Sequence, residues 1–218
     1  MYAHSGYTLY RVDPDTKAMS SVGMFAACGG QIIDIAIDKS GVMYGTTASA
    51  VHRIDKNTAK CTQLASGTGY PNSLSFVPEG TVFANKEALV GYSGGTYVVI
   101  DTQTGQMTSK LSLPSGYSSS GDLVSIAGVG TYLSVNGNGC ADCLLEVNPA
   151  TGQMIQKVGA LGYPSVWGLA YWKGTLYGFT SGGAFFTFDL VTKAGQAVNG
   201  QTGFHFNGAG STTCAPQL

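Results

Sequence analysis

A short apolar strand followed by an Asp- or Asn-led turn recurs five times along this 218-residue chain. The turns begin at Asp13, Asp55, Asp101, Asn148 and Asp189, so that successive turns are 42, 46, 47 and 41 residues apart. The path from Asp189 through the C-terminus and back in from the N-terminus to Asp13 spans another 42 residues. A period of this length, with several short strands per unit, is typical of a β-propeller. We therefore predict an all-β fold, a five-bladed β-propeller with four-stranded antiparallel blades.

The repeat divides the chain into five units within one predicted domain, residues 1–218. The units are 204–218 with 1–24, then 31–66, 72–113, 122–159 and 166–199. The first unit lacks an inner strand at its N-terminal end, and residues 204–210 are expected to supply it. Pairing of the two ends would close the ring and leave no free sheet edge at the seam.

The turns of the repeat read Asp-x-x-Thr, followed by Gly in several copies. The Asp side chain at the head of such a turn accepts hydrogen bonds from backbone N–H groups two residues on. A calcium site in each turn would need more carboxylates than these loops contain. The motif is therefore interpreted as structural.

Charged residues make up only 11% of the chain, and the net charge is −1. Without a long-range positive field, binding to nucleic acid or to an anionic membrane surface is not expected. No stretch of about 18 apolar residues exists, so no membrane span is predicted. The first residues lead directly into a strand and do not resemble a signal peptide. A surface of Ser, Thr, Gly, Asn and Tyr is more typical of a protein that is secreted, on the cell surface or periplasmic.

Five cysteines are present, and Cys140 and Cys143 form the one closely spaced pair. A lone CxxC with neither a second pair nor a paired His motif is weak evidence for zinc. We predict a local disulfide between Cys140 and Cys143, with free thiols as the alternative. The odd number leaves at least one thiol unpaired, and the sequence leaves the pairing of Cys28, Cys61 and Cys214 open.

Most of the twelve acidic residues fall in turns, which leaves Asp34 and Asp122 near inner strands at the central channel. In the sequence alignment of the units, Asp34 matches Ser73, Leu123 and Gly168, so no ring of carboxylates is expected. One channel Asp is more often a hydrogen-bonded strand residue than a general acid or base.

The three histidines, His4, His52 and His205, fall on different strands, although His4 and His205 have the chance to approach across the seam. Neither a GxSxG elbow nor a phosphate-binding loop occurs. We therefore predict a protein that is not an enzyme, with no catalytic residues, no metal and no cofactor.

A glycine followed by an aromatic residue precedes the inner strand in four units, at Tyr70, Tyr117, Tyr163 and Phe204. Phe25 stands near the corresponding place in the remaining connection, and Trp167 follows close behind Tyr163. These loops run from an outer strand to the next inner strand, so they gather around the mouth of the channel. Aromatic rings there would stack against sugars or grip a partner chain. The alternative is that each ring packs under the next blade.

The segment Asp-Ile-Ala-Ile-Asp-Lys-Ser-Gly-Val-Met-Tyr-Gly (34–45), followed by Arg-Ile-Asp-x-x-Thr, resembles bacterial propellers of the NHL, YVTN and gluconolactonase-like superfamily. Residues 97–105, Tyr-Val-Val-Ile-Asp-Thr-Gln-Thr-Gly, are similar to YVTN units. The resemblance covers the whole chain but consists of blade-building motifs. It implies an extracytoplasmic location and binding of a protein or ligand. Gluconolactonase-like members hold a divalent metal with channel carboxylates and Asn, and this chain lacks the matching Glu and Asp set.

The leading functional prediction is a secreted or cell-surface, non-enzymatic binding protein whose partner is an extracellular protein or a glycan. The first alternative is a hydrolase or lyase that acts on sugars or lactones with Asp34 or Asp122. The second is a structural subunit of an extracellular assembly, which includes a homo-oligomer.

Overall fold

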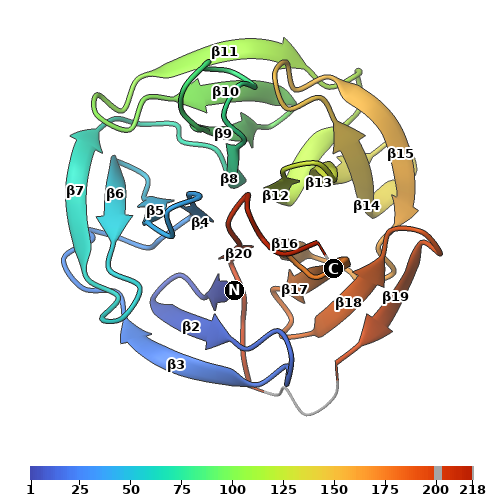
Figure 1. Cartoon of the computed structure of the whole chain (residues 1–218), viewed down its shortest axis with the longest axis horizontal. Coiled ribbons are helices and arrows are strands. Elements are labelled where there is room, and N and C mark those ends of the chain that lie inside the picture. Colours follow the sequence, from blue (N-terminus) through green and yellow to red (C-terminus); the bar gives the residue numbers. More distant parts are fainter. Residues whose placement is uncertain (199–202, 218) are drawn as a thin grey trace.

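A computed structural model of the chain describes residues 1–198 and 203–217. Five four-stranded antiparallel sheets stand around a central axis like blades, and no helix occurs in the described part (Figure 1). The predicted five-bladed propeller is therefore confirmed. The predicted unit ends at 199 and 218 lie outside the described residues.

The four strands of each blade follow one another from the channel to the rim of the ring. Blade 1 contains, in that order, β20 (Gly208–Gly210), β1 (Tyr2–His4), β2 (Thr8–Val12) and β3 (Met19–Met24). Blade 2 contains β4 (Asp34–Ile37), β5 (Met43–Thr46), β6 (Ala50–Ile54) and β7 (Cys61–Ser66). Blade 3 contains β8 (Leu74–Val77), β9 (Ala88–Ser93), β10 (Thr96–Ile100) and β11 (Met107–Ser112). Blade 4 contains β12 (Ser118–Ile126), β13 (Gly130–Gly137), β14 (Cys140–Val147) and β15 (Met154–Ala160). Blade 5 contains β16 (Val166–Trp172), β17 (Thr175–Thr180), β18 (Phe185–Asp189) and β19 (Ala194–Ala197).

The two ends of the chain meet in blade 1, where β20 pairs with β1 in antiparallel register. Tyr2 lies opposite Gly210, and His4 lies opposite Gly208. The prediction that 204–210 would form this strand is correct only for its second half, because β20 begins at Gly208. The backbone N–H of Asn207 still donates to the carbonyl of His4 at 2.7 Å, so the segment joins the seam one residue before the strand.

Burial falls from the inside of the ring to the outside. All four residues of β4 and of β8 are buried, whereas β11 and β19 are almost wholly exposed. Inner strands lie between neighbouring blades, so both of their faces take apolar residues, as expected for strands covered on both sides. Separate apolar cores fill the spaces between adjacent blades; one of them joins Leu9 of blade 1 to Ile35 of blade 2.

The hairpin between β8 and β9 is longer than in the other blades. Sequence patterning predicts a strand over 81–92, but β9 starts only at Ala88, and residues 78–87 form turns. The N–H of Gly80 donates to the carbonyl of Phe83 at 2.8 Å, which closes this loop on itself. A local turn replaces ladder pairing over these residues, so β9 begins later than the sequence pattern predicts.

The five outer turns share one hydrogen-bond pattern. In the first turn, Oδ1 of Asp13 accepts the N–H groups of Asp15 and Thr16, both at 2.9 Å. The equivalent oxygens of the other turns do the same. These bonds stabilise the ionised carboxylate and lower the pKa of Asp13, Asp101 and Asp189. The structural interpretation of the motif is confirmed.

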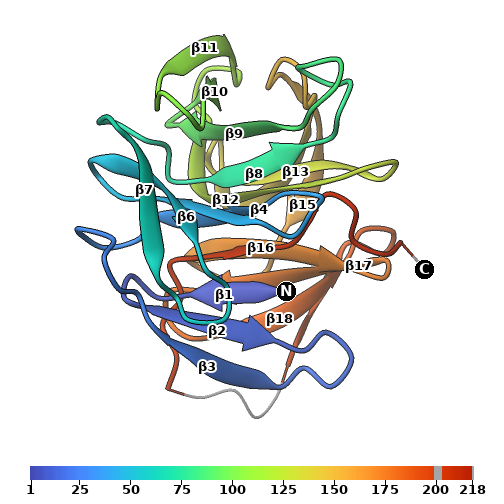
Figure 2. The ribbon, with the colours of Figure 1, turned by 60° about the vertical axis from the view of Figure 1, so that its left-hand side comes forward.

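After β20 the C-terminal segment crosses the end of the channel opposite to the start of the inner strands. Oγ of Ser211 accepts the N–H of Tyr171 in blade 5, and the carbonyl of Thr213 accepts the N–H of Ala127 in blade 4. Thr212 forms a parallel bridge with Ile37 in blade 2. This segment leaves the ring at the right of Figure 2. One face of the propeller is thus crossed by the tail, and the other carries the mouth of the channel.

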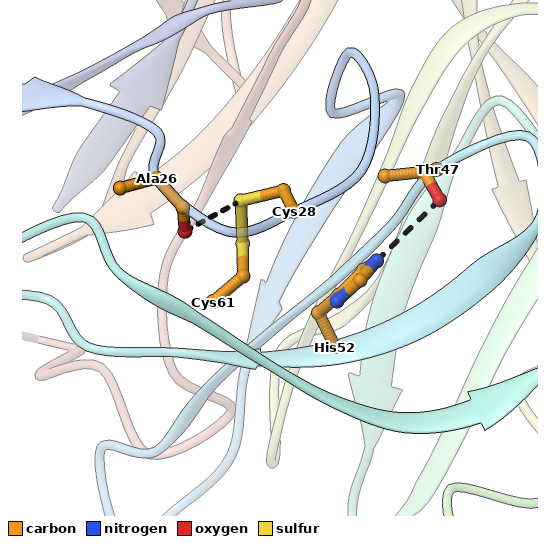
Figure 3. Close-up of a disulfide and its surroundings, with 5 residues drawn as sticks. All are labelled: Ala26, Cys28, Thr47, His52 and Cys61. Carbon is orange, nitrogen blue, oxygen red and sulfur yellow. Dashed lines mark hydrogen bonds between the residues drawn. A yellow bond between two sulfur atoms is a disulfide. The ribbon is translucent and has the colours of Figure 1, made fainter.

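Two disulfides are present. Cys140 pairs with Cys143 as predicted, and Cys28 pairs with Cys61 with a Cα–Cα distance of 5.0 Å. The second bond joins the connection after blade 1 to the outer strand of blade 2 (Figure 3). Cys214 is a free, exposed cysteine. Within the described residues, no helix has the length and apolar character needed to cross a membrane.

Candidate functional site at the channel mouth

The mouth of the channel holds a depression of about 280 Å³ to which every blade contributes. Each blade contributes the residue that comes just before Asp34 or before the residue equivalent to Asp34. These five lining residues are Ile33, Asn72, Gly121, Trp167 and Asn207. Gln31, Ile32 and Ser120 complete it. The lining is therefore made of amides, one hydroxyl, aliphatic groups and an indole, and it contains no charged side chain.

Trp167 is the one aromatic residue in this lining, and 39% of its surface is exposed. It lies at a register shift in the pairing of β16 with β17, between the pairs that Val166 and Gly168 make. A bulge of this kind places an extra residue out of the ladder and redirects its side chain. The local backbone thus turns the indole into the mouth.

The loop before Trp167 is held by Asp142. The Asp142 carboxylate accepts the N–H of Ser165 at 2.7 Å and the N–H of Val166 at 3.3 Å. Asp142 is itself buried, and it lies between Cys140 and Cys143 in β14, with a φ of 54°. The disulfide therefore closes over a bulge in β14, and Asp142 at that bulge holds the backbone next to Trp167.

The other five predicted aromatic residues pack against the blades. Tyr70 is buried and its hydroxyl donates to the carbonyl of Gly105 at 3.2 Å. Tyr163 stacks on Phe186 with ring centres 4.1 Å apart, and Phe204 lies edge-on to Tyr10 at 5.1 Å. Phe25 and Tyr117 are partly buried against the cores beside them. The structure therefore brings Trp167, but not the other five, into the lining of the depression.

Asp34 and Asp122 lie below the mouth, fully buried, where the inner strands begin. Oδ2 of Asp34 accepts the N–H of Leu74 in blade 3 at 2.6 Å. Oδ2 of Asp122 accepts the N–H of Leu169 in blade 5 at 2.6 Å and of Ala209 in blade 1 at 3.3 Å. The two carboxyl groups are also hydrogen-bonded to each other. Together they connect the inner strands of all five blades.

The alignment made from sequence was wrong at one position of this layer. It matched Asp34 to Leu123, whereas the structure matches Asp34 to Asp122. In both residues Oδ1 accepts the N–H of the next residue, Ile35 or Leu123, at 2.8 and 2.6 Å. The register shift between Ser119 and Leu123 in β12 explains the error, because a bulge moves the pattern by one residue. The layer therefore contains two carboxyl groups rather than one.

Burial raises the pKa of both channel carboxyl groups, because the charged form loses its hydration. The pKa of Asp34 lies well above its ordinary value, with the neighbouring Asp122 as a further cause. The pKa of Asp122 is raised to about 8 by burial. At neutral pH the pair thus retains at least one proton, which the two groups share across the channel.

His4 lies beside this pair, with Nε2 3.6 Å from Oδ1 of Asp34. Its Nδ1 is 2.8 Å from the carbonyl of Ser5, an arrangement in which Nδ1 carries the hydrogen. Burial lowers the pKa of His4 to about 4, so the contact with Asp34 is not an ion pair near neutral pH. Within the described residues Nε2 has no hydrogen-bond partner.

His52 and His205 lie elsewhere. His52 is buried near the Cys28–Cys61 disulfide, with Nε2 3.4 Å from Oγ1 of Thr47 (Figure 3). His205 is exposed, and its Nδ1 is 2.9 Å from the carbonyl of Ser181. Across the described ranges, no group of three or more His, Cys, Asp or Glu side chains is placed to hold a metal ion.

Sequence reasoning missed Gln31, Asn72, Ser120 and Asn207. Their signal was positional: Asn72 and Asn207 come directly before the small residues Ser73 and Gly208, at the place that Ile33 holds before Asp34. Isolated amides are common in loops, so these residue types carry no signal of their own.

No protein-family model matches the chain, and no curated protein matches it at a significant level. Among solved structures, it is similar to a structural-genomics protein of unknown function from Bacteroides thetaiotaomicron VPI-5482, with a TM-score of 0.55 and 15% identity over 91% of this chain. It is also similar to a protein of unknown function from Bacteroides caccae, with a TM-score of 0.51 and 13% identity over 94% of this chain and 76% of that one. BamB from Moraxella catarrhalis matches at a TM-score of 0.43 and 13% identity, over 89% of this chain and 62% of that one. This chain spans 56% of the length of the B. thetaiotaomicron chain. At these identities the likeness shows the fold alone.

Proposed function

We propose that this protein is a non-enzymatic binding propeller of an extracytoplasmic compartment that takes an uncharged glycan residue at the channel mouth. The observation that carries the proposal is the exposed indole of Trp167 in a depression lined by one residue position from each of five blades. A propeller of this kind is consistent with a role in binding.

The chemistry of the lining suits a sugar. The apolar C–H face of a pyranose ring stacks on an indole, while its hydroxyl groups exchange hydrogen bonds with amides. Asn72, Asn207 and Gln31 offer both amide donors and acceptors around Trp167. The volume of about 280 Å³ lies near the lower end of the range for small-ligand sites, so the depression suits one sugar residue of a longer chain.

The two disulfides support an extracytoplasmic location. Two disulfides indicate an oxidising environment, which is the setting of secreted, cell-surface and periplasmic proteins. An extracellular protein that carries glycans would be recognised through the same face.

The channel carboxyl groups support a role in binding rather than in hydrolysis. A glycosidase needs one carboxyl group to protonate the leaving oxygen and another to act on the opposite side of the bond. Asp34 and Asp122 are fully buried, and their oxygens accept backbone N–H groups. We assign them to holding the inner strands together.

A glycan array followed by calorimetric titration with the best neutral oligosaccharide tests the proposal. Trp167→Ala should weaken binding at least tenfold, which corresponds to about 1.4 kcal/mol. Phe83→Ala is a matched control, because Phe83 has the same 39% exposure but lies in the long hairpin at the opposite end of the inner strands. Binding of the oligosaccharide should persist in the presence of a metal chelator.

Equal affinity of wild type and Trp167→Ala would contradict the proposed site, as would an equal loss in Phe83→Ala. Mass spectrometry of the oligosaccharide after prolonged incubation adds an independent test. Cleavage that disappears in Asp122→Asn would replace the binding role with the hydrolase alternative.

A further inference from the structure

A second depression, of about 600 Å³, lies on blade 2 at the end of the strands away from the channel mouth. It is formed by the turn between β4 and β5, the turn between β6 and β7, and the adjoining strand ends. Three cationic side chains line it, Arg53, Lys56 and Lys60, together with one acidic residue, Asp55. In a chain with eleven Lys and Arg residues and a net charge of −1, this is a marked concentration of positive charge.

Among the described residues, none of the three cationic side chains of this depression forms an ion pair. The Lys and Arg ion pairs in the described part of the chain join Lys39 to Glu79 and Lys173 to Asp15, so none involves Arg53, Lys56 or Lys60. Oδ1 of Asp55 faces its own turn, where it accepts the N–H groups of Asn57 and Thr58 at 2.8 and 3.2 Å.

Strand register brings Arg53 and Lys60 near each other. Arg53 lies opposite Thr62 in the pairing of β6 with β7. Lys60 comes two residues before Thr62, just ahead of β7, and its carbonyl accepts the N–H of Asp55 at 2.9 Å, which continues the pairing. Side chains two residues apart on a strand share a face, so Lys60 is the diagonal neighbour of Arg53. Lys56 approaches from the turn, with Nζ donating to the carbonyl of Gly41 at 2.9 Å.

Comparison of the five repeats shows that this cluster is specific to blade 2. At the position of Arg53 the other blades carry Arg11, Val99, Glu146 and Thr187. At the position of Lys60 they carry Ala18, Gln106, Gln153 and Ala194. At the position of Lys56 they carry Pro14, Thr102, Pro149 and Leu190. Four blades fold without the cluster, so blade architecture does not require it.

We propose that the depression on blade 2 binds a tetrahedral oxyanion, the sulfate or phosphate ester group of a ligand. The Arg53 guanidinium presents a planar fork of N–H donors that matches two oxygens of such a group, and Lys60 and Lys56 add compact charges. The hydroxyl of Thr62 and the amide of Asn57 provide uncharged donors at the same rim. Leu64, 37% exposed, offers an apolar surface for the carbon part of the ligand. This site is separate from the channel mouth.

Titration of the full chain with two probes tests the proposal and distinguishes its sources. A trisulfated heparin disaccharide represents sulfate esters, and inositol hexakisphosphate represents phosphate esters. The controls are inositol, which is uncharged, and the desulfated disaccharide, which keeps only its uronate carboxylate. We expect one or both anionic probes to bind, with affinity that falls as salt rises. Arg53→Ala with Lys60→Ala should weaken that binding at least tenfold. The probe that binds more tightly identifies the ester.

Arg11→Ala is the matched control, because Arg11 is exposed and occupies the register position of Arg53 in blade 1 without lining the depression. It should change the affinity less than twofold, and so should Trp167→Ala, which separates this site from the proposed glycan site. The absence of binding by both probes would overturn the proposal. A loss in Arg11→Ala equal to that of the double variant would overturn it as well, since only overall charge would then matter.

Discussion

The carboxyl groups of Asp34 and Asp122 are hydrogen-bonded to each other across the channel, although they belong to blades 2 and 4, which are not neighbours in the ring. Each also accepts backbone N–H groups from other blades. A protonated carboxyl pair is therefore a direct connection between the inner strands.

The shared proton predicts an unusual dependence of stability on pH. Because the pKa of Asp122 is raised to about 8 in the folded protein, the folded state keeps a proton that the unfolded chain releases above about pH 4. This contribution is complete at low pH and is lost as the pH rises toward the folded pKa. Between the unfolded and folded pKa values, each such proton makes the free energy of unfolding fall by about 1.4 kcal/mol for every unit by which the pH rises.

Two other groups change the stability with pH in the opposite direction, and their contributions must be separated from that of the carboxyl pair. The pKa of His4 is lowered to about 4, so above about pH 6.5 this group no longer changes the stability as the pH rises. The α-amino group of Met1, with a pKa lowered to about 6 by burial, adds stability as the pH rises from 6 to 8. Urea unfolding of wild type and Asp122→Asn between pH 6.5 and 8 isolates the pair, since both proteins contain Met1 and His4. The wild type should lose stability more steeply; parallel profiles would refute the shared proton.

Gly208 is predicted to tolerate no side chain. A Cβ there would lie 2.1 Å from Oδ1 of Asp34 and 2.5 Å from Nε2 of His4. Gly208→Ala should therefore push the carboxyl pair apart and lower the free energy of unfolding by about 2–4 kcal/mol. Gly159→Ala in β15 is the control, because its nearest atom would be Cβ of Lys193 at 3.9 Å. Urea unfolding measures both, and similar stabilities of the two variants would show that the carboxyl pair yields easily.

Asp142 is predicted to restrict the motion of Trp167. Asp142→Asn leaves one oxygen to serve the N–H groups of Ser165 and Val166, a local cost of about 1–2 kcal/mol. In a Trp172→Phe background, Trp167 is the only tryptophan, so acrylamide quenching reports its accessibility. Quenching should rise in Asp142→Asn.

Asp101→Asn serves as the control for that measurement, because Asp101 also accepts two backbone N–H groups but lies in the outer turn of blade 3. An equal rise in the control would mean that the quenching reports general loosening. No rise in Asp142→Asn would show that the bulge alone positions the indole.

The number of blades, the seam and the outer turns were predictable from sequence because each rests on local or repeated chemistry. An Asp or Asn followed by Thr three residues later forms the same turn in all five blades, and its spacing counts the blades. The Cys140–Cys143 disulfide was predictable for a similar reason, since two cysteines three residues apart are close in space whatever the rest of the chain does. The pairing of Cys28 with Cys61 was not, because it depends on how blade 2 docks on the connection that precedes it.

The candidate site depended on features that sequence spacing does not report. Trp167 and Asp122 were expected near the mouth and the channel, but the bulges at Trp167 and before Leu123, which shift the side-chain alternation by one residue, were not expected. The sequence by itself determined a closed five-unit ring, because the repeat and its turns act over short distances. Only the tertiary structure decided which residues of different blades meet on the axis, because contacts between strands 40 or more residues apart depend on register and packing rather than on the neighbouring sequence.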